Sequence, residues 1–145
     1  CQGTAVMGMG WPGAEMKIEV DGETIAGQML MVLIGNNRIY GGGVFHLSPH
    51  WRLDDGALEM WAFEGRGYGE TLARAWDLRR GRHINHPRVQ HRAGRRFVIT
   101  TERPLPAQVD GDLLDRPTPL TIEVAPRALR VLVPRTAPAD LFTGE

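Results

Sequence analysis

The clearest alternation of hydrophobic and polar residues lies near the start of the chain. Apolar and charged residues alternate from residue 16 to residue 20, and an apolar stretch follows from Ile25 to Ile34. Strict alternation is typical of a strand with one buried face, and Asp-Gly dipeptides readily adopt the positive φ of a tight turn. With Asp21-Gly22 between the two stretches, the pattern predicts an antiparallel β-hairpin.

A second periodicity, of about 3.6 residues, occurs in the middle of the chain. It predicts one helix, from about Tyr68 to Arg80. Glu70 in its first turn, with Arg79 and Arg80 in its last, complements the helix dipole, and Gly81 can form a left-handed cap. Four residues fall on one face of this helix: Tyr68, Leu72, Ala75 and Trp76.

The rest of the chain predicts short strands separated by turns. Eighteen glycines and ten prolines punctuate the sequence, which disfavours a mainly helical protein. We expect a mainly β fold, an antiparallel β-sandwich with one helix, in a single domain over residues 1–134. Residues 135–145 lack periodicity, and there we expect a disordered or loosely attached tail. The predicted strands lie at residues 58–62, around Val89, and at residues 96–100, 107–109, 120–124 and 128–133.

Charge, cysteine content and the length of apolar runs disfavour a nucleic-acid-binding, disulfide-stabilised or membrane-spanning protein. The chain of 145 residues has 17 basic and 17 acidic side chains, so it lacks the positive field expected of a nucleic-acid-binding protein. Its one cysteine, Cys1, excludes an intramolecular disulfide and fits a reducing compartment, so we expect a cytoplasmic protein. The longest apolar run, Met29 to Ile34, is far shorter than the ~20 residues of a membrane-spanning helix.

Two acidic turns are candidates for chemistry. At Asp54-Asp55-Gly56, a glycine bend can bring backbone carbonyls beside a carboxylate, and Mg²⁺ favours such oxygen ligands. At Asp110-Gly111-Asp112, a carboxylate at a strand end could accept a proton from a substrate hydroxyl as a general base. Taken alone, both stretches are more typical of ordinary turns with solvated carboxylates. Asp21-Gly22-Glu23 has the same local form, and its place between two paired strands favours a simple turn.

Histidine and arginine residues after the helix add weaker signals. His83 and His86 have a spacing close to that of metal ligands, but no further cluster completes a zinc set, so we expect surface histidines. Five basic residues follow, which could contact anionic lipid headgroups or simply form a solvated hairpin. They are Arg88, His91, Arg92, Arg95 and Arg96. The triplet Gly41-Gly42-Gly43 lacks the lysine and the helix of a phosphate-binding loop.

The order of these motifs resembles that of one enzyme family. In chain order, the motifs are Gly35-Asn36-Asn37, the glycine triplet, Pro49, the first acidic turn with Ala57-Leu58, the helix, the second acidic turn and a closing stretch from Ile122 to Pro134. This order resembles the bacterial diacylglycerol kinase and sphingosine kinase-like lipid kinases, which are distant relatives of the NAD kinases. The resemblance covers residues 16–134.

The resemblance implies that this chain is the carboxy-terminal, substrate-side domain of a two-domain lipid kinase. In that family, an N-terminal ATP-binding domain of α/β type carries a Gly-Gly-Asp-Gly motif, which this sequence does not contain. The implied partners are this domain and a lipid substrate such as diacylglycerol, with peripheral contact to a membrane. We expect the isolated domain to be inactive, and its exposed strand edges would favour a homodimer.

The resemblance also implies roles for residues of the two acidic turns. A structural Mg²⁺ would be held by the carboxylate of Asp55 and by the backbone carbonyls of Arg52 and Ala57. Asp112 matches the glutamate of the family's Asp-Gly-Glu motif, whose carboxylate is thought to deprotonate the lipid hydroxyl; the aspartate here is one methylene shorter. The implied reaction transfers the γ-phosphoryl group of ATP to a lipid alcohol.

Two other functions fit parts of the same sequence. A kinase of the same superfamily with a soluble substrate, such as NAD kinase, would share the fold. A non-catalytic β-sandwich binding module would share the fold without the chemistry. An upstream Gly-Gly-Asp-Gly segment in the reading frame would favour a kinase. The lipid itself is not identified, because no short motif encodes the apolar cleft for acyl chains.

Overall fold

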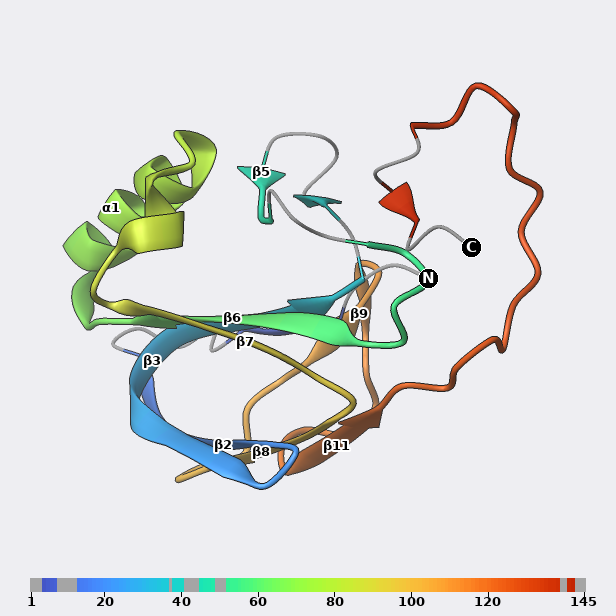
Figure 1. The fold of residues 1–145 in the computed structure, drawn as a ribbon. Helices are drawn as coiled ribbons and strands as arrows, with labels where there is room; N and C mark the ends of the chain where they lie inside the picture. The colour runs from blue at the N-terminus through green and yellow to red at the C-terminus, as the bar shows by residue number, and fades with distance from the viewer. Residues whose placement is uncertain are drawn as a thin grey trace.

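The chain forms two layers of antiparallel strands with a helix beside them (Figure 1). The computed structural model describes residues 4–7, 13–36, 38–40, 45–48, 52–138 and 141–142. Over these residues, the predicted class, an antiparallel β-sandwich with one α-helix, is confirmed. Cys1, Asn37, the glycine triplet at 41–43 and Pro49 lie outside the described residues.

The predicted hairpin, the helix and most of the predicted short strands are present. The hairpin consists of β2 and β3, and Gly81 after the helix has the expected positive φ, 68°. A short 3₁₀ helix, η1 (Arg82–Asn85), follows α1 (Gly67–Arg79). The strands are β1 (Thr4–Met7), β2 (Ala14–Val20), β3 (Glu23–Gly35), β4 (Ile39–Tyr40), β5 (Phe45–His46), β6 (Leu58–Glu64), β7 (Val89–Gly94), β8 (Arg96–Thr101), β9 (Gln108–Val109), β10 (Asp112–Leu113) and β11 (Leu120–Glu123).

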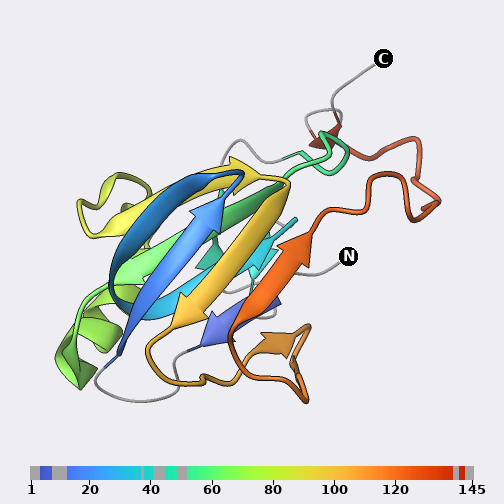
Figure 2. The same cartoon turned by 90° about the horizontal axis from the view of Figure 1, so that it is seen from below.

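The long strand β3 belongs to both layers. Its first half pairs with β2, which continues through β8 to β11. Its second half pairs with β1 on one edge and with β6 on the other. The register against β6 shifts between Met29 and Met31, and such an irregularity bends a strand. Figure 1 shows β3 curving from the lower layer to the upper one, and Figure 2 shows β2, β8 and β11 side by side from below.

Residues of β3 and β6 are buried on both faces of the upper layer. Val32 and Ile34 point into the core between the layers, together with Met60 of β6. Leu33 lies in a second cluster on the opposite face. This arrangement explains the unbroken apolar stretch in the sequence, because a strand covered on both sides has no solvent face. The second cluster consists of Leu33, Leu47, Trp61, Phe63 and Leu78, with Met31 and Val89 packed against it.

Helix α1 contacts the protein through little apolar surface. Leu78 is its buried residue, and it packs in the second cluster. The four residues predicted to share a helical face do not form the buried side, because Tyr68, Leu72, Ala75 and Trp76 are all exposed. Among the described residues, no helix is long and apolar enough to cross a membrane.

The turn between β2 and β3 also fixes the neighbouring turn between β7 and β8. Asp21 and Gly22 both have positive φ, 48° and 95°, as a two-residue hairpin requires. The Asp21 carboxylate accepts hydrogen bonds from the backbone N–H groups of Arg95 and Arg96, at 2.9 and 2.8 Å. Gly94 permits this approach, because a Cβ there would lie 2.5 Å from Cγ1 of Val20.

The strand predicted at residues 128–133 is wrong. After β11 the chain turns at Pro126 and Arg127, which has a φ of 57°, and then runs without assigned strand structure. Alternating apolar residues indicate a strand only where a partner strand completes the hydrogen bonds, and no such pairing is formed by residues 128–133 within the described part of the chain. The tail returns at Leu141, whose carbonyl accepts a hydrogen bond of 2.8 Å from the backbone N–H of Leu53.

Asp21→Ala is expected to lower the free energy of unfolding by about 1–3 kcal/mol, because two backbone donors lose a charged acceptor. Urea unfolding would measure this loss. Asp110→Ala is the matched control, since Asp110 begins another two-residue turn with a φ of 56° and its carboxylate makes no hydrogen bond with the described residues. Equal losses in the two variants would contradict the role assigned to Asp21.

Candidate functional site

The first acidic turn is a bend that leads into β6. Gly56 has a positive φ of 74° there, and Oδ1 of the exposed Asp55 accepts a hydrogen bond of 3.0 Å from the backbone N–H of Ala57. This hydrogen bond forms an Asx-type turn. It uses one oxygen of the Asp55 carboxylate, so the local geometry fits the ordinary turn and leaves a second oxygen for other chemistry.

The bend is tied to two other segments through Leu53. Its backbone carbonyl accepts a hydrogen bond of 3.0 Å from Nδ2 of Asn36, at the end of β3. Its backbone N–H donates to the carbonyl of Leu141. Asn36, part of one of the sequence motifs, therefore has a structural role in holding the acidic bend at the end of the sheet.

The bend offers one carboxylate, that of Asp55, among the donors that the resemblance assigns to a metal ion. No group of three His, Cys, Asp or Glu side chains within the described segments is arranged to hold a metal ion. An ion held by Asp55 would therefore depend on backbone carbonyls, such as those of Arg52 and Ala57, and on water. Mg²⁺ accepts such a shell, because it commonly binds one or two carboxylates and retains several waters.

The second acidic turn is a two-residue hairpin. Asp110 and Gly111 have positive φ values of 56° and 99°, and Val109 pairs directly with Asp112. Asp112 is the first residue of β10 and is exposed. Asp112 thus lies at a strand end, and its role as a general base stays a prediction.

Both acidic turns lie at the same end of the upper layer (Figure 1). Asp112 and Met60 are connected by residues that pair directly from each strand to the next, and Met60 follows the first acidic turn by a few residues. Four strand spacings lie between Asp112 and Met60, a distance of roughly 20 Å across a flat sheet. The turns therefore share an end of the molecule without direct contact. The connected residues are Asp112, Val109, Thr4, Ile34 and Met60.

His83 is fully buried, so its predicted surface position is wrong. Nε2 of His83 lies 2.8 Å from the carbonyl of Leu47, to which it donates, and the ring meets Trp61 edge-on at 5.0 Å. Nδ1 has no hydrogen-bond partner among the residues that the structure describes. Burial lowers the pKa of His83, more than the contact with the Leu47 carbonyl raises it. These contacts describe a neutral core histidine that joins η1 to the sheet.

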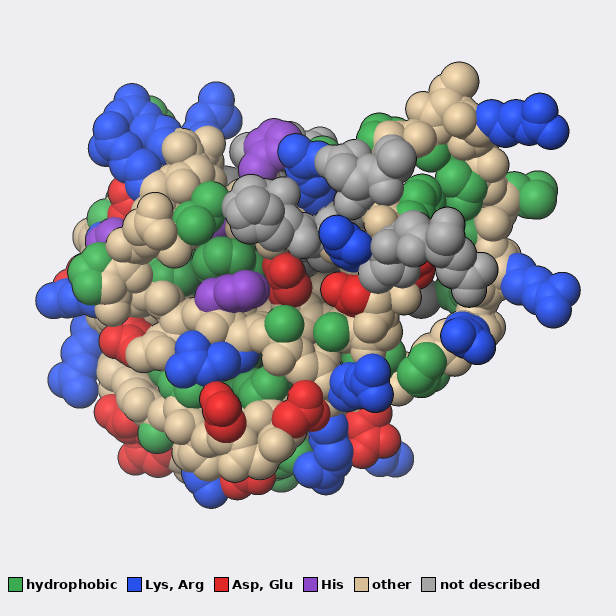
Figure 3. All heavy atoms as spheres, in the orientation of Figure 1, with side chains coloured by type: hydrophobic (Ala, Val, Ile, Leu, Met, Phe, Trp, Pro, Cys, Tyr) green, Lys and Arg blue, Asp and Glu red, His purple; other side chains and the backbone are tan. Residues whose placement is uncertain are grey.

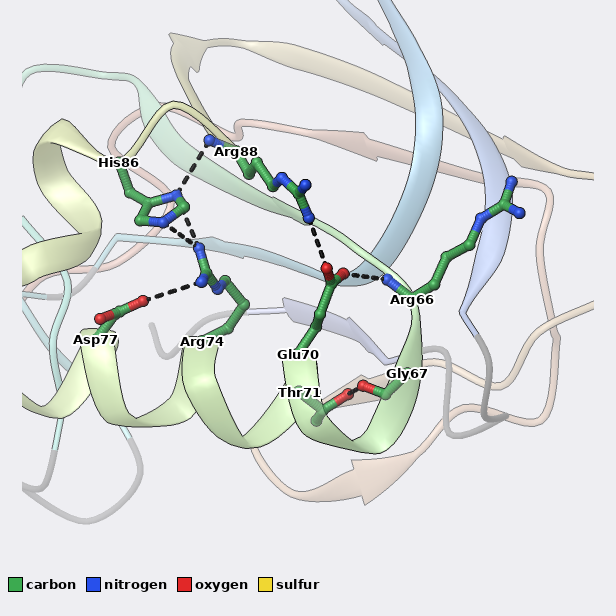
Figure 4. Close-up of polar contacts among 8 residues, drawn as sticks. All are labelled: Arg66, Gly67, Glu70, Thr71, Arg74, Asp77, His86 and Arg88. Carbon is green, nitrogen blue, oxygen red and sulfur yellow. Dashed lines mark hydrogen bonds and ion pairs between the residues drawn. The ribbon is translucent and has the colours of Figure 1, made fainter.

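A polar network between α1 and the start of β7 was not predicted from the sequence (Figure 4). Glu70 accepts hydrogen bonds of 2.6 Å from the backbone N–H of Arg66 and from Nη1 of Arg88. These two contacts, the backbone one first, hold the pKa of Glu70 below its usual value. Arg74 bridges the imidazole of His86 and the carboxylate of Asp77. Such pairs join segments far apart in sequence, so no local pattern reveals them.

Most of the five basic residues from Arg88 to Arg96 lie beside an acidic side chain. Four of the five form such pairs: Arg88 with Glu70 at 2.6 Å, His91 with Glu59 at 3.7 Å, Arg92 with Glu23 at 3.5 Å and Arg96 with Glu123 at 2.9 Å. His91 also stacks on Trp61 at 4.2 Å. These pairs fit the solvated hairpin, and contact with anionic headgroups at these residues stays a prediction.

Comparison with known proteins agrees with this architecture. Residues 5–133 match the family described as the YegS C-terminal NAD kinase beta sandwich-like domain. A diacylglycerol kinase of Staphylococcus carnosus is 30% identical over 98 residues, which cover 68% of this chain and 32% of that protein. A putative lipid kinase of Staphylococcus aureus strain JH9 is 26% identical over 121 residues, covering 80% and 38%.

Solved structures show the same fold. A putative diacylglycerol kinase from Bacillus anthracis aligns with a TM-score of 0.67 at 20% identity, over 86% of this chain and 49% of that one. A second structure described in the same words has a TM-score of 0.62 at 24% identity, over 80% and 38%. The chain thus spans about a third of the curated relatives and up to half of the solved chains. The matched range includes both acidic turns.

We expect the stability of the protein to fall as the pH drops below about 6.5, because His83 is held neutral in the folded state. The unfolded chain binds a proton near that pH, whereas the lowered pKa of His83 keeps the folded chain from doing so. One such group makes the free energy of unfolding fall by up to about 1.4 kcal/mol for each pH unit. Urea unfolding at several pH values between 5 and 8 measures it.

His83→Gln provides the comparison for this experiment, since a glutamine side chain can still donate to the Leu47 carbonyl but does not titrate. Its unfolding free energy should depend less steeply on pH below about 6.5. An identical slope in the variant would show that other groups cause the pH dependence.

Proposed function

Because this chain belongs to the family of YegS C-terminal NAD kinase beta sandwich-like domains, we propose that it is the substrate-side domain of an ATP-dependent lipid kinase of the diacylglycerol kinase type. The observation that carries the proposal is the presence of both acidic turns at one end of the upper layer. Relatives named as diacylglycerol kinase and putative lipid kinase favour a lipid alcohol over a soluble dinucleotide as the substrate.

In this proposal, Asp112 is the general base. Its exposed carboxylate accepts the proton of the lipid hydroxyl while that oxygen forms a bond to the γ-phosphorus of ATP and the bond to ADP breaks. Such a transfer depends mainly on positioning and on neutralising the phosphate charges. The two-residue turn before Asp112 supports this role, because it places the exposed aspartate at the start of β10.

The first acidic turn would bind a structural Mg²⁺. The Asp55 carboxylate and the backbone carbonyls of Arg52 and Ala57 are the groups that would hold it, with water completing the shell. When bound, the ion would supply positive charge and rigidity at this end of the sheet. Without the ion, the bend is held by two hydrogen bonds, from the Ala57 N–H to Asp55 and from Asn36 to the Leu53 carbonyl.

ATP would be held mainly by an N-terminal domain that meets this end of the sandwich. The segment from Leu129 to Val133 supports a docking role, since its apolar side chains are exposed and Leu132 is 100% exposed. Contiguous exposed apolar residues commonly mark interaction surfaces. The kinase would work in the cytoplasm, where ATP is available, with peripheral contact to the membrane that contains its substrate.

Asp112→Asn in the natural full-length protein should reduce ATP-dependent phosphorylation of diacylglycerol by about 10²–10⁴-fold, which is the usual contribution of a general base. Asp112→Glu should retain activity, because it restores the longer carboxylate. Phosphate transfer from labelled ATP to diacylglycerol measures both, and NAD as the acceptor tests the soluble alternative.

Asp110→Asn is the matched control for this assay, since it changes the charge of the same turn two residues away. It should leave the activity within a few-fold of the natural protein. The isolated domain should form no product. Full activity of Asp112→Asn, or product formed by the isolated domain, would refute the proposed division of roles.

Mg²⁺ should raise the midpoint of thermal unfolding of the natural protein, because a ligand that binds only the folded state stabilises it. Asp55→Asn should abolish this rise, since an asparagine keeps the acceptor for the Ala57 N–H but loses the charge. Asp54→Asn is the control for the adjacent charge and should keep the effect. If Mg²⁺ raises the unfolding midpoint of Asp55→Asn equally, the ion does not bind at this bend.

A further inference from the structure

Helix α1 carries a stripe of large apolar side chains on its solvent side, while two charged side chains lie against the protein beside the buried Leu78. The side chains of Arg74 and Asp77 are only 16% and 19% exposed, and they pair with each other at 3.3 Å. By contrast, Tyr68 is 69%, Leu72 72% and Trp76 52% exposed. These three residues follow one another at intervals of four, so they form a continuous stripe along the helix. A surface helix normally has the opposite arrangement.

Three exposed arginines lie beyond the end of this stripe. Arg79, Arg80 and Arg82 form no ion pair with any described residue, while the two acidic residues of α1, Glu70 and Asp77, are already paired with other arginines. The guanidinium of Arg80 lies 4.3 Å from the centre of the Trp76 ring. Figure 3 shows basic side chains gathered over the top of α1.

We propose that the face formed by α1 and the start of η1, defined by Tyr68, Leu72, Trp76, Arg79, Arg80 and Arg82, docks on an anionic lipid bilayer. The inference rests on the proposed function, because a kinase for membrane alcohols has to reach a lipid surface. Tyrosine and tryptophan side chains favour the boundary between headgroups and acyl chains, and a helix with an apolar stripe can lie in that boundary. The arginines would then meet lipid phosphates, to which a guanidinium fork is well matched.

The positions of the charges favour a membrane over a second copy of the chain. A two-fold dimer brings the same patch of both subunits together, so the unpaired arginines would face each other or remain without acidic partners. The place of the helix also disfavours the N-terminal domain. Strand β6 runs from the first acidic turn at one end to α1 at the other, so this face lies away from the end that would hold ATP (Figure 1).

Cosedimentation of the natural full-length protein with vesicles tests the docking face. Vesicles of phosphatidylcholine alone and of phosphatidylcholine with phosphatidylglycerol are compared, without ATP or diacylglycerol. Arg79→Gln/Arg80→Gln/Arg82→Gln should weaken binding to the anionic vesicles at least tenfold, since each basic residue near such a surface contributes substantially. Leu72→Gln/Trp76→Gln should weaken it by a similar factor, because the apolar stripe no longer inserts.

Matched controls for this test come from other parts of the surface. Arg116→Gln/Arg127→Gln/Arg135→Gln removes the same charge from exposed positions outside α1 and outside the segment from Leu129 to Val133. Leu113→Gln removes a leucine that is 71% exposed, almost equal to Leu72. Both controls should bind vesicles like the natural protein, and circular dichroism of all variants confirms that they are folded.

Three results would overturn the docking proposal: no binding to anionic vesicles, equal binding by the α1 variants and the natural protein, or a dimer that becomes a monomer in Leu72→Gln/Trp76→Gln. The last result would assign the face to a second copy. Because the vesicle assay contains no ATP, its outcome is independent of the kinase assay. Lipid phosphorylation without α1-dependent binding would refute the docking face alone, and binding without phosphorylation would refute the kinase alone.

Discussion

The bend of β3 is the feature on which the rest of the structure depends. Because the strand changes layer near Met29, its first half supports β2, β8 and β11, and its second half supports β1 and β6. Strand β6 is thereby buried on both faces, between the sandwich core and the cluster under α1. Strand β6 has the first acidic turn before it and α1 after it. The length of β6 therefore separates the acidic turns from the surface of the helix.

Three Asp-Gly turns of the same local form have three different surroundings. The carboxylate of Asp21 is used inside the fold, where it holds the N–H groups of Arg95 and Arg96. Asp55 accepts the N–H of Ala57 within its own bend, whereas Asp112 follows a hairpin and is exposed. The three places share only the Asp-Gly dipeptide, and the surrounding chain decides what each carboxylate contacts. Strand pairing places the last two at one end of the sheet, whereas Asp21 links two neighbouring turns.

Much of the fold could be predicted from the sequence, because its main signals are local. The hairpin followed from alternation around Asp21-Gly22, and the helix from its periodicity and from Gly81. The burial of His83 could not be predicted, because it depends on Leu47 and Trp61, which are distant in sequence. The segment at 128–133 has the alternation of a strand, but a strand also needs a neighbour with free backbone groups, and sequence periodicity carries no information about that neighbour.

The helix shows how a correct periodicity can indicate the wrong environment. Four apolar residues at helical spacing normally mark the side that packs on a core, and here the core contact is made by Leu78 while the protein side also holds Arg74 and Asp77. An arginine with little exposure has to be paired, because an unpaired charge in such a place is costly, and His86 and Asp77 meet that need. The fold therefore stabilises the helix through polar contacts and leaves its apolar stripe outside. The proposed contact with a lipid bilayer would give this exposed stripe a role outside the domain.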